Sequence, residues 1–108
     1  MDNLINMSCK NSQTVSKLSI EQIAKYINDN IPEWQLNTNC DFISKHFNFK
    51  NFKQTMFFVN AVAYMCEKEA HHPDMRIGFN YCEINFQTHD VNGISINDII
   101  CAVKIDNL

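Results

Sequence analysis

The chain has 108 residues, 45% of them hydrophobic, and a formal net charge of -3. This length is enough for one domain with a small core and too short for two. Because the charge is weakly negative and no apolar run has the length of a membrane span, the composition argues against direct nucleic-acid binding and against a membrane protein.

Cysteine usage and the N-terminal segment together predict a cytoplasmic protein. The five cysteines are an odd number with no close pair along the chain, which argues against a disulfide framework and against a thiolate zinc site. Cys66, Cys82 and Cys101 occupy apolar positions of predicted elements, so we expect them in the core. Residues 1–17 resemble neither a secretory signal nor a transit peptide.

The chain is predicted to begin with a flexible arm. Residues 1–17 are polar and rich in Asn and Ser, and we expect residues 18–108 to form a single domain after them. The first helix of that domain begins after Ser19, which makes a capping-box pattern with Gln22, and it ends before Pro32. Its buried face has the helical spacing of Ile20, Ile23, Ala24 and Ile27.

Two short strands are predicted next, over residues 34–37 and 42–49. The Asn-rich turn between them predicts a hairpin. His46 falls on the more polar face of the second strand. Nothing around His46 indicates chemistry.

The longest predicted element is a helix over residues 51–70, which is apolar nearly all round. A domain of this size can cover one side of such a helix with its sheet but lacks the material to cover the others. We therefore expect self-association to a dimer or tetramer through this helix and a sheet edge. The alternative is that its aromatic residues line a cofactor pocket. Its apolar residues form three stripes, which are Phe52, Met56, Val59, Ala63 and Cys66, then Phe58, Val62 and Met65, and then Phe57, Ala61 and Tyr64.

Two more strands are predicted over residues 75–79 and 81–88, the second alternating between apolar and polar positions. Ser95, with Asp98 three residues later, predicts the start of a last helix. The order is helix-strand-strand-helix-strand-strand-helix. It predicts an α+β fold in which a four-stranded antiparallel sheet has three helices packed on one face.

Three of the four histidines lie near the ends of predicted elements. His71 and His72 fall where the long helix stops, because Pro73 biases His72 out of the helical region. His89 falls just past a strand end. A helix end and a strand end can place imidazoles around one cleft, where a pair of them can give and take protons near neutral pH.

The spacing of these residues resembles the signature of the pterin-4a-carbinolamine dehydratase family. The resemblance covers residues 18–105 and extends upstream through the aromatic and lysine segment at 47–52, Trp34 and Leu18-Ser19. Its central pattern is Glu67-x3-His71-His72-Pro73-x5-Phe79-x9-His89-x8-Asp98.

The resemblance implies an enzyme that dehydrates a 4a-hydroxytetrahydropterin to quinonoid dihydropterin and water, in tetrahydrobiopterin recycling. One proton goes to the departing hydroxyl and one leaves N5, which suits histidine and requires no metal or cofactor. The implied acid–base pair is His71 and His89, with His72 and Glu67 as further catalytic residues. The residues expected to bind the reduced pterin are Ala70, His71, His72, Pro73, Gln87, Thr88, His89, Asp90 and Asp98.

Helix geometry adds two expectations about the individual roles. Glu67 lies one turn before His71, so its carboxylate should meet that imidazole. His71 is expected in the last turn of its helix, where the dipole favours the protonated ring and supports a role as the acid. Asp98 is expected either to serve the site or to cap the last helix.

Two other functions compete with dehydration. A zinc or iron site could use the three histidines and Glu67, although adjacent His71 and His72 on a continuous helix would project about 100° apart. The other is a binding module, since some family members act as dimerisation partners of transcription factors. Such a module would use the apolar helix and have no need of the histidines.

Overall fold

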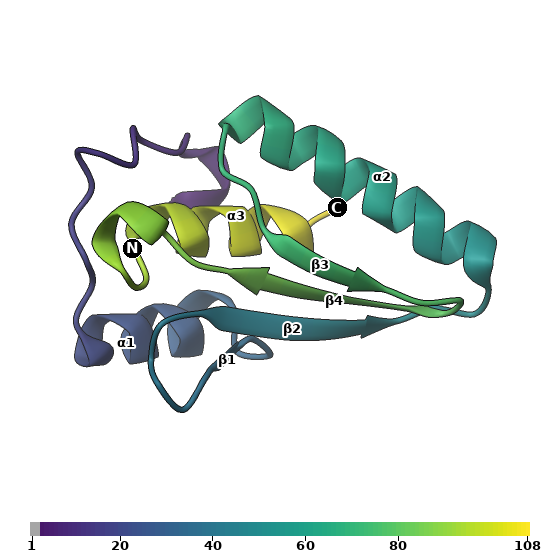
Figure 1. The fold of residues 1–108 in the computed structure, drawn as a ribbon, viewed down its shortest axis with the longest axis horizontal. Helices are drawn as coiled ribbons and strands as arrows, with labels where there is room; N and C mark the ends of the chain where they lie inside the picture. Colours follow the sequence, from purple (N-terminus) through teal and green to yellow (C-terminus); the bar gives the residue numbers. More distant parts are fainter. Residues whose placement is uncertain (1–2) are drawn as a thin grey trace.

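The computed structural model describes residues 3–108, which form three α-helices and a four-stranded antiparallel sheet (Figure 1). The observed order confirms the predicted α+β fold. Within this range no helix is long and apolar enough to cross a membrane. The elements are η1 (Leu4–Asn6), α1 (Ile20–Asn30), β1 (Gln35–Leu36), β2 (Ile43–Asn48), α2 (Phe52–Glu69), β3 (Asp74–Ile77), β4 (Tyr81–Phe86), η2 (His89–Val91) and α3 (Ile96–Asp106), where η denotes a 3-10 turn.

The sheet has the strand order β1-β2-β4-β3, so β2 and β4 form its centre. Ile43 pairs with Phe86 and Phe47 with Cys82, which places these side chains on the same face. All three helices lie on that side of the sheet, and the opposite side is open (Figure 1). The predicted hairpin is confirmed, because β1 pairs antiparallel with β2.

The core lies between the sheet and the helices and is organised around Trp34. Its ring centroid lies 6.2 Å from that of Phe47 and 6.0 Å from that of Phe86, and its indole N–H donates to Asp106 at 3.1 Å. Lys45 interrupts the apolar pattern of β2. It is tolerated there because its ammonium group passes over the Phe47 ring and reaches Asp106 at 2.9 Å.

The three cysteines predicted to lie in the core do so, and all five cysteines are free thiols. Cys66, Cys82 and Cys101 are buried, and burial raises the pKa of the Cys82 thiol to about 11. The sulfur of Cys9 lies 3.5 Å from that of Cys101, a proximity that their separation in the sequence did not indicate.

The N-terminal arm makes tertiary contacts that its composition did not indicate. Sequence composition predicted a flexible segment over residues 1–17, of which the structure describes residues 3–17. Leu4 is only 2% exposed and belongs to the core cluster. The Lys104 ammonium donates to the carbonyl of Ile5 at 3.1 Å. The partners of this segment are distant in the sequence, so local composition could not reveal them.

Candidate active site

A cavity of about 360 Å³ lies where the end of α2, the end of β4 and the N-terminal arm meet. This size is in the range of small-molecule sites. Its wall contains every residue predicted to bind the pterin except Asp98, together with two that were not predicted, Ser12 and Asp74. The full lining is Ser12, Ala70, His71, His72, Pro73, Asp74, Gln87, Thr88, His89 and Asp90.

The end of α2 determines where His71 points. Ala70 follows the helix in the left-handed conformation, with φ 54° and ψ 36°. Its amide bonds to the carbonyls of Cys66 and Glu67, and the amide of His71 reaches back to Cys66 at 3.2 Å, a pattern that ends helices. The prediction that His71 lies in the last helical turn is therefore wrong, and the helix-dipole argument for its role as the acid does not apply.

A buried carboxylate fixes the ring of His71. Its Nε2 lies 2.7 Å from Oδ1 of Asp98, whose side chain is fully buried. The second oxygen, Oδ2, accepts from the hydroxyl of Thr88 at 2.7 Å and from the amide of Ser95 at 2.9 Å. The imidazole also stacks on Phe86, with 5.6 Å between centroids and 7° between planes. These contacts hold the ring in one orientation.

The other ring nitrogen of His71 is available to a ligand. Nδ1 has no hydrogen-bond partner within residues 3–108. It is not fully enclosed, because in that range Oδ1 of Asn85 is the only buried side-chain polar atom without a partner. His71 lines the cavity, and because Nε2 is bonded to Asp98, Nδ1 is the ring nitrogen left for a ligand there. Asp98 on Nε2 can balance the charge that the ring carries whenever Nδ1 is protonated.

Asp98 makes two sets of contacts and does not line the cavity. It completes the capping box of α3 with Ser95, and it orients His71 from behind. The expectation of direct pterin contact does not match its position, because it is fully buried and absent from the lining.

Glu67 contacts a different histidine from the one predicted. Its Oε1 lies 2.8 Å from Nε2 of His72, and the predicted contact with His71 is wrong. The left-handed turn at Ala70 breaks the helical spacing on which that prediction depended. Both members of the pair are exposed, His72 by 64% and Glu67 by 81%, and Glu67 does not line the cavity.

His89 reaches the cavity from a tight turn after β4. The turn is closed by paired backbone hydrogen bonds between Thr88 and Gly93 and by the left-handed Asn92, with φ 51°. The Thr88 hydroxyl is buried and lies 2.7 Å from that of Ser95. The ring of His89 makes no hydrogen bond within the described residues and is exposed, so it remains free to act on a ligand.

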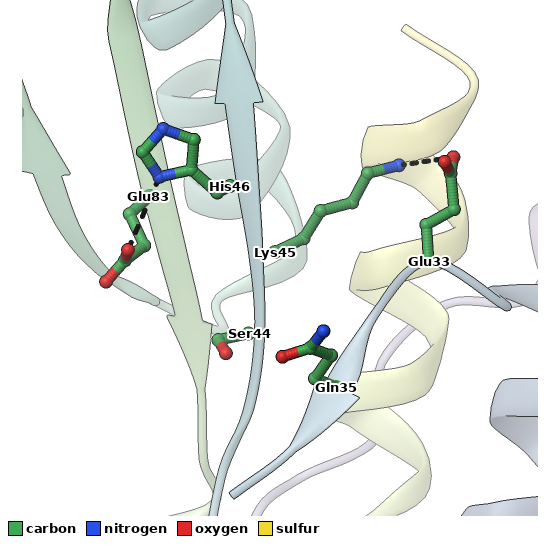
Figure 2. Close-up of a pocket in the computed structure, with 6 residues that line it drawn as sticks. All are labelled: Glu33, Gln35, Ser44, Lys45, His46 and Glu83. Atoms are coloured by element: carbon green, nitrogen blue, oxygen red, sulfur yellow. Dashed lines mark hydrogen bonds and ion pairs between the residues drawn. The ribbon is translucent and has the colours of Figure 1, made fainter.

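The fourth histidine lies at a second cavity of about 290 Å³ on the open face of the sheet (Figure 2). Nδ1 of His46 lies 3.4 Å from Glu83, and its ring stacks on Tyr81. Lys45 is paired with Glu33 at 3.6 Å and with Asp106. The charged side chains that line this second cavity are thus already paired with one another. Nowhere in residues 3–108 do three or more His, Cys, Asp or Glu side chains cluster as a metal site would require.

The chain is similar to known proteins over almost its whole length. The family model described as Pterin 4 alpha carbinolamine dehydratase matches residues 16–108. Proteins of Legionella pneumophila (strain Corby) and Nitrosomonas europaea, both named "Putative pterin-4-alpha-carbinolamine dehydratase", are 41% and 42% identical over 106 residues. These alignments cover 97% of this chain and 94% and 92% of theirs.

Two solved structures share the fold. The crystal structure of a transcriptional coactivator/pterin dehydratase from Brucella melitensis has a TM-score of 0.79 and 26% identity, covering 84% of this chain and 96% of that one. A pterin dehydratase-like protein identified as a RuBisCO assembly factor in the alpha-carboxysome has a TM-score of 0.62 and 22% identity, covering 69% and 87%. The family model and the curated relatives confirm the resemblance seen in the sequence, and this chain belongs to the pterin-4-alpha-carbinolamine dehydratase family.

Proposed function

We propose that this protein is a hydro-lyase that converts 4a-hydroxytetrahydrobiopterin to quinonoid dihydropterin and water, in the recycling of tetrahydrobiopterin. Membership of the family supports the reaction class. The observation that carries the proposal is that His71 and His89, 18 positions apart in the printed sequence, line one cavity of about 360 Å³.

The reaction needs two proton transfers, and the cavity offers two imidazoles for them. The hydroxyl on C4a leaves as water once it receives a proton, and N5 gives up a proton as its lone pair forms the new double bond. His71 and His89 exchange these protons. A well-placed acid or base contributes roughly 10²- to 10⁴-fold to such a step.

Supporting residues then have distinct roles in this proposal. Asp98 orients His71 and balances its charge when the ring is protonated. His72, paired with Glu67 at the rim, binds and orients the pterin. Polar groups suited to the amide and amino edge of a pterin are available on the remaining wall, from Asp74, Gln87 and Asp90, whereas the buried hydroxyl of Thr88 is already bonded to Asp98 and Ser95.

Self-association is a second part of the proposal, supported by the surface of α2. Phe57 and Tyr64 on this helix are 66% and 73% exposed, so the domain leaves an apolar face of α2 uncovered. Edge strand β3 adds the exposed Ile77. A dimer or tetramer formed through these surfaces would bury them. The same α2 face favours a protein-binding module as the alternative function.

Stopped-flow measurement of carbinolamine decay, with and without the purified protein, tests the enzyme. We expect His71→Ala and His89→Ala each to slow the catalysed decay at least about tenfold. His46→Ala, which removes the imidazole at the second cavity, should leave the rate unchanged. Sedimentation of all three variants should match the wild type, because none of these residues lies on α2.

Near-normal turnover in both His71→Ala and His89→Ala would contradict the proposed reaction. If the wild type also failed to accelerate the decay, the binding-module alternative would be favoured.

A further inference from the structure

The N-terminal arm makes contacts through residues that the family model does not include. The family model begins at residue 16, so residues 3–15 lie outside it, although the alignments with the curated relatives cover 97% of this chain. In Figure 1 the arm, in purple, runs from beside α3 past the turn after β4 to the start of α1. The amide of Leu18 donates to the carbonyl of Ile94 at 2.8 Å, which fixes the far end of the arm.

Two helices hold the middle of the arm through its backbone. The amide of Cys9 donates to Glu69 of α2 at 2.8 Å. The amide of Lys10 donates to the side-chain carbonyl of Asn97 at 2.8 Å, and the amide group of Asn97 returns a hydrogen bond to the carbonyl of Lys10 at 2.7 Å. Asn97 is only 1% exposed, and its buried amide is satisfied by the arm. This attachment is therefore part of the folded structure.

Beyond this attachment, the arm turns toward the cavity. The amide and hydroxyl of Thr14 both donate to the carbonyl of Asn11 at 2.9 Å, forming a turn over residues 11–14. Ser12 in this turn lines the same cavity as His71 and His89. Its hydroxyl donates to Oδ2 of Asp90 at 2.5 Å.

We propose that the arm is one wall of the pterin cavity and that Ser12 is a positioning residue, holding Asp90 and, through it, the turn that carries His89. Thr88 anchors one side of this turn in the protein, whereas His89 and Asp90 are exposed. Within the described residues the Asp90 carboxylate has no hydrogen bond other than that from Ser12. The inference rests on the proposed function, because it assigns Ser12 a task in placing His89.

Steady-state dehydration by Ser12→Ala, Ser12→Thr and Ser16→Ala tests this role. Losing the bond from Ser12 should lower kcat about three- to tenfold in Ser12→Ala, with a smaller change in KM, because the rest of the pterin site remains. Ser12→Thr keeps a hydroxyl and should recover kcat to within about twofold of the wild type. Ser16→Ala is the matched control, an exposed serine of the same arm outside the cavity lining.

A second readout does not depend on activity. In spectra of the histidine side chains, Ser12→Ala should shift the ring resonances of His89 and leave those of His46 in place, and Ser12→Thr should return them. If Ser12→Ala shifts the His89 resonances but the wild-type protein does not dehydrate carbinolamine, the proposed function is overturned and the positioning role of Ser12 is kept. A dehydratase in which Ser12→Ala matches Ser16→Ala in both kcat and His89 resonances would overturn the positioning role alone.

Discussion

The two cavities each contain a histidine paired with a carboxylate, but the pairs have opposite environments. At the first cavity, the side chain of His71 is 9% exposed and lies 2.7 Å from the fully buried Asp98. At the second, His46 is 44% exposed and lies 3.4 Å from Glu83, which is 31% exposed (Figure 2). The two cavities have similar volumes, about 360 and 290 Å³. Volume therefore does not distinguish them, whereas the support of the imidazole does.

The difference arises from the elements that carry each pair. His46 and Glu83 are cross-strand partners on the open face of the sheet, where no helix covers them. Asp98 lies in the first turn of α3, beneath the sheet, and His71 reaches it only because the chain leaves α2 through a left-handed residue. A surface pair is screened by water and easily rearranged, but a buried pair holds one geometry. A fixed geometry favours proton transfer to a bound ligand, and at the first cavity His71 has it.

The largest expected effect is the difference between two substitutions, each of which neutralises the carboxylate paired with one of these histidines. Asp98→Asn should lower turnover about 10- to 100-fold, because an amide cannot both orient His71 and balance its charge. It should also cost about 1–3 kcal/mol of unfolding free energy, since hydrogen bonds from Thr88 and Ser95 lose a charged acceptor. Stopped-flow kinetics and urea unfolding measure the two effects.

Glu83→Gln is the matched substitution at the second cavity. It should change turnover less than about twofold and unfolding free energy by less than about 1 kcal/mol, as expected for a surface ion pair. Equal losses of turnover in Asp98→Asn and Glu83→Gln would remove the distinction between the cavities.

A smaller effect is expected at the residue that redirects the chain toward His71. Ala70 has φ 54°, which costs an L-residue roughly 1–2 kcal/mol, and no residue lining the second cavity has a positive φ. Ala70→Gly should therefore raise the unfolding free energy by about 1 kcal/mol. The same substitution at Ala63, exposed in the interior of α2, should lower it by about 1 kcal/mol. A loss of stability in both variants would show that Ala70 is not strained.

Most of the fold was predictable because its signals are local. The capping residues Ser19 and Ser95, the alternating pattern of β4 and the apolar stripes of α2 each depend on neighbours a few positions apart. The arm was not predictable in this way. Its contacts join Cys9 to Glu69 and Lys10 to Asn97. No periodic pattern in residues 1–17 indicates partners so distant in the sequence.

Of the site, the sequence indicated which residues would lie near one another better than it indicated their contacts. Eight of the nine residues that the family resemblance implied line one cavity, but helix geometry assigned Glu67 to the wrong histidine because the helix was assumed to continue through residue 70. An alanine gives no sequence signal for a left-handed conformation, whereas Gly or Asn would have. Asp74 had a signal, since it directly follows His71-His72-Pro73, and Ser12 had none.

The smallest expected effect again separates the cavities, because only the first is walled by the arm. Although burial opposes ionisation of Glu69, the amide of Cys9 and the ammonium of Lys104 hold its pKa below the ordinary 4.5. A carboxylate with a lowered pKa stabilises the fold above its unfolded value, and this contribution is lost as pH falls through the folded value. The attachment of the arm should therefore be complete above pH 4.5 and weaken below it.

An NMR titration measures this effect. The resonance of the Cys9 amide should shift with a midpoint below pH 4.5, while that of the Lys10 amide, which is bonded to the non-titrating Asn97, should shift less. A Cys9 midpoint at or above 4.5 would mean that burial outweighs the two donors.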